Sequence, residues 1–173
     1  DLGTLVRSTY LGGTASGGGF AGFDSARALA IHPVNGDIYV AGQTSAADFP
    51  GVGSGAQSVW GGDRDAFVSR LSADLTTLKR STYLGGTVSD PAYALAIHPA
   101  TGEVYVAGST SSPSLPGTTG SAQPAPGGGS NDAFVARFAA DLGTLIRSSY
   151  LGGAGVEDAT ALAIHPVSGE IYV

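Results

Sequence analysis

Arg-Ser-Thr-Tyr-Leu-Gly-Gly at residues 80–86 has two further copies in this chain, one identical and one with a single change, and this repetition decides how the chain is organised. The same segment stands at residues 7–13 and, with one change, at residues 147–153. The other recurring blocks are Ala-Leu-Ala-Ile-His-Pro at residues 28–33, 94–99 and 161–166, Tyr-Val at residues 39–40, 105–106 and 172–173, and Asp-Ala-Phe-Val at residues 65–68 and 132–135. The chain therefore has an internal period of about 67 residues, and its first copy is lengthened by an insertion near residues 16–23.

Each full copy contains four apolar blocks of strand length, rich in Val, Ile, Tyr and Phe and separated by turn-forming residues. In the first full copy these blocks are residues 28–31, 37–42, 65–71 and 78–84. No helical periodicity lies between them. Four short strands per repeat are typical of a propeller blade. The sequence therefore predicts an all-β fold, a β-propeller of four-stranded antiparallel blades. The small apolar block at residues 28–31 is expected to be the innermost strand, covered on both sides.

The repeat boundaries predict how the blades divide the chain. Residues 1–13 are expected to be the outer strand of a preceding blade, residues 24–86 and 90–153 two blades, and residues 157–173 the inner strands of a further one. A propeller needs about four to eight blades, so these residues predict an incomplete ring. We expect the missing blades to come from other propeller repeats in the same chain. The alternative is completion by copies of itself, in a closed assembly or a fibre.

These blocks resemble the SBBP repeat, a beta-propeller repeat of large exported bacterial proteins. The resemblance is carried by Ser-Thr-Tyr-Leu-Gly-Gly, by Ala-Leu-Ala-Ile-His-Pro followed by Ile-Tyr-Val-Ala-Gly, and by Gly-Gly followed by Asp-Ala-Phe-Val, and it covers nearly the whole chain. It implies a propeller of four-stranded blades and an extracellular or cell-surface location. It implies no catalytic residues.

Composition excludes several classes of function. Asp and Glu number 14 against 8 Lys and Arg, which gives a net charge of −6 without long runs, so nucleic acid is not an expected partner. The chain has no Cys and no Met, which removes thiolate chemistry and Cys-based metal sites. No apolar run is long enough for a membrane span. Because no catalytic or phosphate-binding motif is present, we expect neither an enzyme nor a cofactor.

Three histidines are weak candidates for metal ligands, since imidazole is a common ligand. They are His32, His98 and His165, one in each copy. Equivalent positions in different blades lie a blade apart, whereas metal ligands must converge on one ion. We therefore expect no metal site, and we interpret Asp63, Asp65 and Asp132 as turn and strand-entry residues.

The segments that vary between copies indicate a binding face. The second-to-third loops at residues 44–62 and 110–131 are long, and they emerge on the same side as the blade-to-blade connection that carries the insertion. Variation on one face of a repeat array is typical of a binding surface. The aromatic candidates there are Phe20, Phe23, Phe49 and Trp60. The competing interpretation of Phe49 and its counterpart Leu115 is that they pin the loops to the blades.

Together these patterns predict a non-enzymatic extracellular scaffold or protein-interaction module, as a segment of a larger repeat protein or a subunit of an assembly. The alternative is a lectin-like or other ligand-binding propeller that uses the long-loop face, with a surface protein or glycan as partner. Glycan binding would require clustered exposed aromatics on that face. A third hypothesis, an enzyme with a site on the propeller axis, has no motif to support it.

Overall fold

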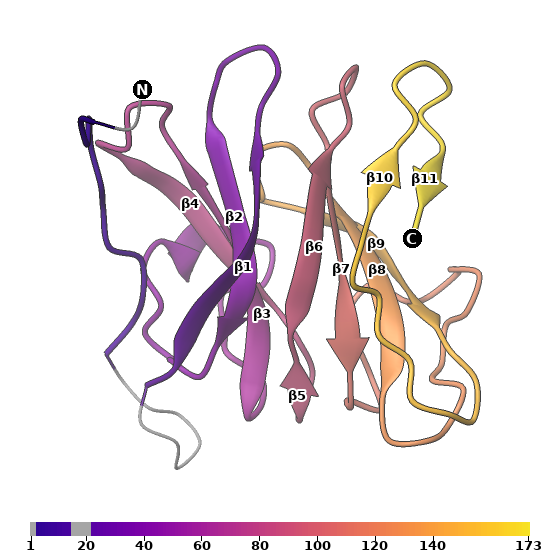
Figure 1. Cartoon of the computed structure of the whole chain (residues 1–173). Helices are drawn as coiled ribbons and strands as arrows, with labels where there is room; N and C mark the ends of the chain where they lie inside the picture. The colour runs from indigo at the N-terminus through magenta and orange to yellow at the C-terminus, as the bar shows by residue number, and fades with distance from the viewer. Residues whose placement is uncertain (1–2, 15–21) are drawn as a thin grey trace.

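The protein is built from antiparallel β-sheets (Figure 1). The computed structural model describes residues 3–14 and 22–173. Its strands are β1 (Asp24–Ile31), β2 (Ile38–Thr44), β3 (Arg64–Leu71), β4 (Leu78–Leu84), β5 (Ser89–Asp90), β6 (Ala92–Ile97), β7 (Val104–Thr110), β8 (Asp132–Phe138), β9 (Leu145–Leu151), β10 (Ala163–Ile164) and β11 (Ile171–Tyr172). A 3-10 turn, η1 (Val52–Ser54), lies in the first long loop, and the described residues form no α-helix.

Two sheets repeat the same topology. The first sheet has the order β1-β2-β3-β4 and the second sheet the order β6-β7-β8-β9, while β10 and β11 form a two-stranded pair. The short β5 adds a parallel pairing with β3, where the chain passes from one sheet to the next. The predicted all-β class and the four antiparallel strands per repeat are thus confirmed. None of the sheets is closed on itself, and the propeller ring stays a prediction.

The two sheets pack against each other through their inner strands, because β6 lies along β1 and β2. Figure 1 shows this arrangement, with β10 in turn beside β6. One buried cluster spans both sheets, and it includes Tyr39, Val68, Val106, Phe134 and Leu142. Each sheet therefore buries one apolar face against its neighbour, which is what the hydrophobic effect requires of a sheet with two largely apolar faces.

The inner strands are covered to different extents. In β6, Ala92 is fully buried and Leu95 is only 9% exposed. In β1, Leu29 and Ile31 are 60% and 63% exposed. The expectation that the inner strand is covered on both sides holds for β6, because β6 lies between β1 and β10. It is wrong for β1, which has β6 on one side only.

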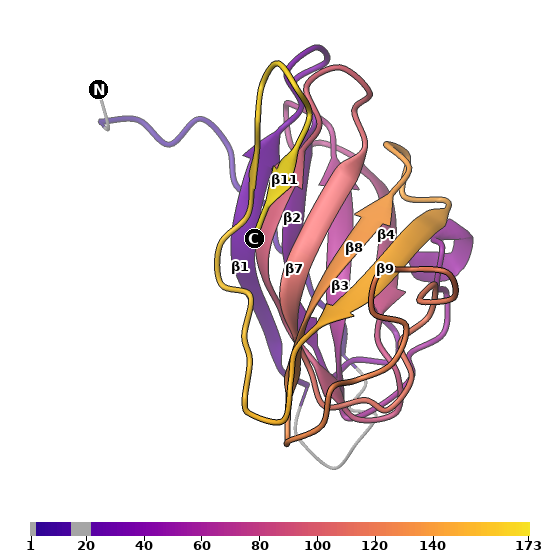
Figure 2. The ribbon, with the colours of Figure 1, turned by 90° about the vertical axis from the view of Figure 1, so that its right-hand side faces the viewer.

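Residues 5–11 belong to the segment predicted as the outer strand of a preceding blade, and that assignment stays a prediction. They pair with no strand among the described residues. Leu5, Val6 and Tyr10 are almost fully exposed, and Figure 2 shows this part of the chain leading away from the sheets. The physical reason is that a strand is made by inter-strand hydrogen bonds, and here no equivalent of β3 lies alongside to supply them.

A buried tyrosine fastens each long loop to its sheet. Tyr83 on β4 donates a hydrogen bond of 2.8 Å to the carbonyl of Ala46 and accepts one of 3.0 Å from the amide of Phe49. Tyr150 on β9 makes the same pair of contacts to the loop that holds Leu115. Phe49 itself is buried, and its ring stacks on Phe67 at 4.5 Å. The pinning interpretation of Phe49 and Leu115 is thereby confirmed.

Replacing Tyr83 by Phe should lower the free energy of unfolding by about 1–3 kcal/mol, because a buried amide and a buried carbonyl both lose their partner. Tyr10→Phe is a matched control: Tyr10 has the same repeat position but is fully exposed, so its replacement should change stability by less than about 0.5 kcal/mol. Urea denaturation measures both. Equal effects of the two substitutions would contradict the proposed fastening.

Candidate functional site

The contact between the two sheets is built on a tight turn between β8 and β9, residues 139–143, here called the Asp-Leu turn. The amide of Leu142 donates to the carbonyl of Ala139 at 2.9 Å, and the Asp141 carboxylate accepts from the amide of Gly143 at 2.9 Å. Leu142 has φ 61, a left-handed conformation that costs an L-residue roughly 1–2 kcal/mol. Its side chain is nevertheless fully buried, so packing against the first sheet holds it there.

The Asp-Leu turn docks on the first sheet through main-chain and side-chain hydrogen bonds. The amide of Ala56 donates to the carbonyl of Leu142 at 3.0 Å. The Tyr39 hydroxyl donates to the carbonyl of Ala140 at 2.5 Å. Arg80 donates to both the carboxylate and the carbonyl of Asp141, at 2.8 and 2.9 Å. The turn is thus recognised mainly through its backbone, its one carboxylate and its leucine side chain.

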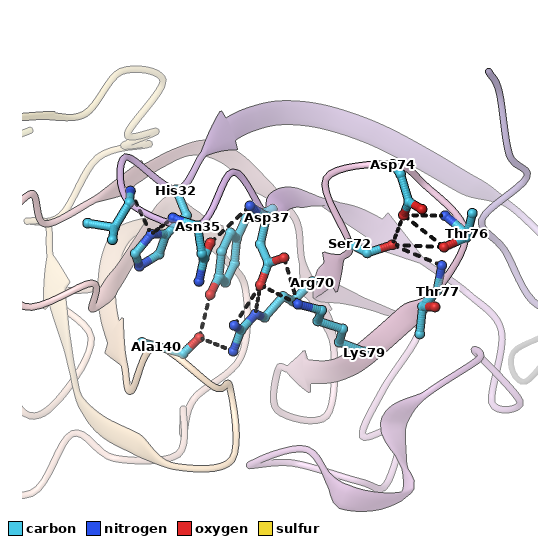
Figure 3. Close-up of polar contacts among 12 residues, drawn as sticks. His32, Asn35, Asp37, Arg70, Ser72, Asp74, Thr76, Thr77, Lys79 and Ala140 are labelled. Atoms are coloured by element: carbon cyan, nitrogen blue, oxygen red, sulfur yellow. Dashed lines mark hydrogen bonds and ion pairs between the residues drawn. The ribbon is translucent and has the colours of Figure 1, made fainter. Parts of the chain in front are cut away.

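A cluster of ion pairs next to the Asp-Leu turn orients the side chains of the first sheet that bind the turn. Asp37 is buried and accepts from both Arg70 and Lys79 (Figure 3). Burial raises the pKa of Asp37, but the hydrogen bonds and charges of Lys79 and Arg70 outweigh it and hold that pKa below its ordinary value. The guanidinium of Arg70 also lies 5.7 Å from the centre of the Tyr39 ring and reaches the carbonyl of Ala140. Arg70 therefore links the ion cluster to the docked turn.

The second sheet repeats this arrangement with Glu103 in place of Asp37. Glu103 pairs with Arg137 at 2.7 Å, and the Arg137 guanidinium lies 5.8 Å from the centre of the Tyr105 ring. The hydrogen bond from Arg137 lowers the pKa of Glu103. Both sheets thus carry the same row of a tyrosine and two arginines on adjacent strands, and the pairing registers Tyr39↔Arg70↔Arg80 and Tyr105↔Arg137↔Arg147 match.

The three histidines stabilise turns in their own copies. In each, Nδ1 accepts backbone amides two and three residues later: Val34 and Asn35 for His32, Ala100 and Thr101 for His98, Val167 and Ser168 for His165. Among the residues that the structure describes, no three His, Cys, Asp or Glu side chains come together as metal ligands do.

The far nitrogen of two of these histidines faces the next copy. A Cβ placed on Gly102 would lie 2.8 Å from Nε2 of His32, and one on Gly169 would lie 2.6 Å from Nε2 of His98. Both glycines have positive φ as well. The histidine turn of each sheet therefore packs directly against the glycine turn of the following one.

Two buried carboxyl groups meet at the Leu-Gly-Gly segment that follows β4. Asp65 accepts from the amide of Gly61 at 2.8 Å, while its Oδ1 has no hydrogen-bond partner. Asp90 accepts from the amide of Gly86 at 2.7 Å. A Cβ on Gly85 would lie 2.5 Å from Asp65 Oδ1 and 3.0 Å from Asp90 Oδ2, so only glycine fits between the two carboxyl groups.

This arrangement raises the pKa of the Asp65 carboxyl group. Burial, reinforced by the charge of Asp90, raises the pKa of Asp65 to about 7 against the lowering effect of the Gly61 amide. Burial also raises the pKa of Asp90. Asp65 and Asp132 lie at the beginning of β3 and β8, where strand-entry residues were expected.

The aromatic candidates do not form an exposed cluster among the described residues. Phe23 is 42% exposed, and the Arg64 guanidinium lies 5.5 Å from the centre of its ring. Phe49 is buried, and Trp60 is half-buried against the cluster of Phe49, Phe67 and Tyr83. Phe20 lies outside the described residues. The structure therefore leaves Phe23 as the one exposed aromatic of the three candidates it describes.

Comparison with protein-family models and with curated proteins found no match for this chain. The similarity to the SBBP repeat therefore rests on the motifs alone. Within the described part of the chain, no helix has the length and apolar character needed to cross a membrane.

Sequence reasoning did not identify the Asp-Leu turn. Its signal is the Asp-Leu pair at residues 74–75 and 141–142, each a fixed distance before the Arg-Ser segment. Leu75 has φ 57 and donates its amide to the carbonyl of Ser72 at 2.9 Å, so the same turn forms in both sheets.

Replacing Leu142 by Ala should lower the free energy of unfolding by about 2–5 kcal/mol, because it empties a fully buried site between the two sheets. Leu75→Ala is the matched control: Leu75 has the same turn conformation but is only half-buried, and its replacement should cost about 1 kcal/mol or less. Chemical denaturation of the two variants checks this. A smaller effect at Leu142 than at Leu75 would refute the docking role of the turn.

Stability should fall as pH rises from about 4 to about 7, because the native state retains the Asp65 proton in this range while the unfolded chain, with an ordinary pKa of 3.8, has released it. Asp65→Asn should reduce this slope and raise stability at pH 8. An amide oxygen can still accept from Gly61. Asp63→Asn, at an exposed carboxylate, is the control. Thermal unfolding of the three proteins between pH 4 and 8 tests this prediction. If the dependence of stability on pH were unchanged in Asp65→Asn, the assigned role of Asp65 would be wrong.

Proposed function

We propose that this chain is a non-enzymatic scaffold or protein-interaction module of β-propeller type, as a segment of a larger repeat protein or a subunit of an assembly. We further propose that it acts outside the cell or on its surface. The observation that carries the proposal is the face-to-face stacking of two four-stranded sheets through the Asp-Leu turn. A stack of this kind gives a rigid body whose parts recur at fixed intervals.

The roles of the polar residues support a structural function. The histidines bond to their own turns, Asp37 is neutralised by Arg70 and Lys79, and Arg80 binds Asp141. The hydrogen bonds and ion pairs of these side chains stabilise the fold or the packing of one sheet on the other. A catalytic site would instead need polar groups aimed at a shared space where a substrate could bind.

The ligand-binding alternative has less support. It requires exposed aromatics gathered on the long-loop face, whereas Phe49 and Trp60 pack inward and only Phe23 of the described candidates is exposed. The scaffold function is therefore the better supported of the two.

A rigid scaffold should unfold as one unit. The single tryptophan, Trp60, reports on the first sheet and its loop, whereas far-ultraviolet circular dichroism reports on both sheets. The two signals should give coincident denaturation curves. Leu142→Ala, a change in the second sheet, should move the Trp60 transition to the same extent as the dichroism transition. The Leu75→Ala variant serves as the control.

Separate transitions would show that the two sheets fold independently, which would overturn the rigid-scaffold proposal. The second part of the test is to probe a glycan array with the same chain. Saturable binding of one glycan class that is lost in Phe23→Ala would replace the scaffold with the ligand-binding function, and no binding together with coincident transitions supports the scaffold.

A further inference from the structure

Two buried aspartates lie opposite each other where the chain passes from the first sheet to the second. Asp65, at the beginning of β3, and Asp90, on the short β5, are direct partners in the parallel pairing of these strands (Figure 1). Both residues are fully buried. Like charges directly opposite on adjacent strands are destabilising, so a fold that keeps two acids there needs something to offset their repulsion. We call these two residues the acid pair.

No ion pair within residues 3–14 and 22–173 supplies that offset. The ion pairs there join Asp37, Glu103 and Asp141 to arginine or lysine side chains, and none of them includes Asp65 or Asp90. When both of its carboxyl groups are ionised, the acid pair therefore places two negative charges in the interior without an ion-pair partner. Buried charges in proteins are normally paired or coordinate a metal.

One carboxylate oxygen of the acid pair lacks a hydrogen bond. Asp65 Oδ2 accepts from the amide of Gly61 at 2.8 Å and from Gln57 Nε2 at 3.4 Å, whereas Asp65 Oδ1 is buried and has no partner. This Oδ1 is directed toward Asp90, because a Cβ on Gly85 would lie 2.5 Å from Asp65 Oδ1 and 3.0 Å from Asp90 Oδ2. A buried acceptor of this kind is one that a bound water or ion satisfies.

The second carboxylate of the acid pair is fixed by three donors. Asp90 Oδ2 accepts from the amide of Gly86 at 2.7 Å and from the Ser112 hydroxyl at 2.8 Å, and Asp90 Oδ1 accepts from the Thr110 hydroxyl. These donors come from both sides of Asp90 in the chain and set the orientation of its carboxylate. The acid pair is therefore a preformed arrangement rather than two side chains that can turn away from each other.

The same pair of acids recurs at the next junction between copies. The bridge Asn131↔Val156 repeats the pairing of β3 with β5 and places Asp132 opposite Glu157. A Cβ on Gly152 would collide with Asp132 Oδ1 and would lie 2.9 Å from Glu157 Oε2. The pairing of acids thus belongs to the repeat. Sequence reasoning missed it, because the two acids of each pair belong to successive copies.

We propose that Asp65 and Asp90 bind one calcium ion, which bridges β3 and β5 at the junction of the two sheets. Calcium takes oxygen ligands only, and it accepts carboxylates, main-chain carbonyls and water in a flexible geometry. The carbonyl oxygens of Gly85 and Gly86 lie beside Gly61, the residue whose amide binds Asp65. Magnesium suits the place less well, because it demands a near-ideal octahedron and releases its water reluctantly.

This site differs from the metal sites that the sequence argued against. Equivalent residues of different copies were expected to lie too far apart to share an ion, whereas Asp65 and Asp90 are non-equivalent residues of adjacent copies that the fold brings together. The inference is independent of the proposed function, since an ion at this junction would stabilise the packing of the sheets whatever the chain binds.

The test is the effect of calcium on thermal unfolding of the intact chain at pH 8. The protein is unfolded in urea with a chelator and refolded with or without calcium, so that the ion need not enter the native interior. Calcium at about 10 mM should raise Tm by about 3–6 °C, as expected for a Kd on the order of 1 mM. Magnesium at the same concentration should raise Tm by less than about 1 °C.

Two matched variants locate the effect. Asp65→Asn should reduce the calcium shift to less than about 1 °C, because the charge of the ligands sets calcium affinity. Its amide oxygen can still accept from Gly61, so the variant should fold. Asp63→Asn removes the same charge at an exposed carboxylate two residues earlier, and it should keep the full shift.

Terbium luminescence locates the ion without any substitution. Terbium(III) binds oxygen ligands as calcium does, and it emits light when a nearby indole transfers energy to it. Trp60, the only tryptophan, directly precedes Gly61, whose amide binds Asp65. Excitation of Trp60 should therefore produce terbium emission, and calcium should abolish that emission by displacing the terbium.

Absence of a calcium shift in the native chain would overturn the proposal, as would an equal shift with magnesium or an undiminished shift in Asp65→Asn. Bound terbium that Trp60 does not excite would place the ion elsewhere and would also overturn it. If Asp65→Asn did not fold, the terbium measurement would decide alone. Each of these failures leaves the coincident-unfolding test of the scaffold unaffected.

Discussion

The insertion of Leu142 between the two sheets is the interaction on which the rest of the structure depends. A single four-stranded sheet of this composition has two largely apolar faces and cannot bury both by itself. The Asp-Leu turn places the outer hairpin of the second sheet on a face of the first sheet, where it contacts Tyr39, Ala56 and Arg80. One apolar face of each sheet is thereby buried. The left-handed backbone at Leu142 is strained, and its burial compensates. The ion cluster at Asp37 and the histidine turns then fix the two sheets in register.

Much of the fold could be predicted because it is local and repeated. Strand-length apolar blocks separated by Gly, Pro and Asn determine β2, β3 and β4 almost to the residue. Residues 5–11 have the same sequence pattern as β4 yet form no strand, since strand formation depends on a neighbour as well as on propensity. The Asp-Leu turn was missed for a related reason. Leucine is a poor marker of a left-handed backbone, so only the recurrence of Asp-Leu at a fixed distance before the Arg-Ser segment distinguishes this turn from an ordinary connector.

The candidate site was predicted less well, because burial is not readable from residue type alone. An aromatic residue is equally suited to a binding face and to a core. Phe49 and Trp60 turned out to hold a loop in place, as the competing interpretation of Phe49 expected. The histidines were considered as metal ligands, but in the structure Nδ1 of each accepts backbone amides of its own turn. Asp65 looked like a simple strand-entry residue, and its pKa is raised by burial and, to a smaller extent, by the charge of Asp90, both of which only the folded chain supplies.

Each copy of the repeat carries both halves of such a contact: a turn at Leu75 or Leu142, of which the Leu142 turn binds the preceding copy, and a row with Tyr39 or Tyr105, of which the Tyr39 row accepts the turn of the following copy. A gene that duplicates one such unit in frame would therefore produce a longer protein in which every new junction is already compatible. No second mutation would be needed to create a matching surface. The contact sets how adjacent copies join but leaves their number open, so length can change by whole units while each junction stays the same.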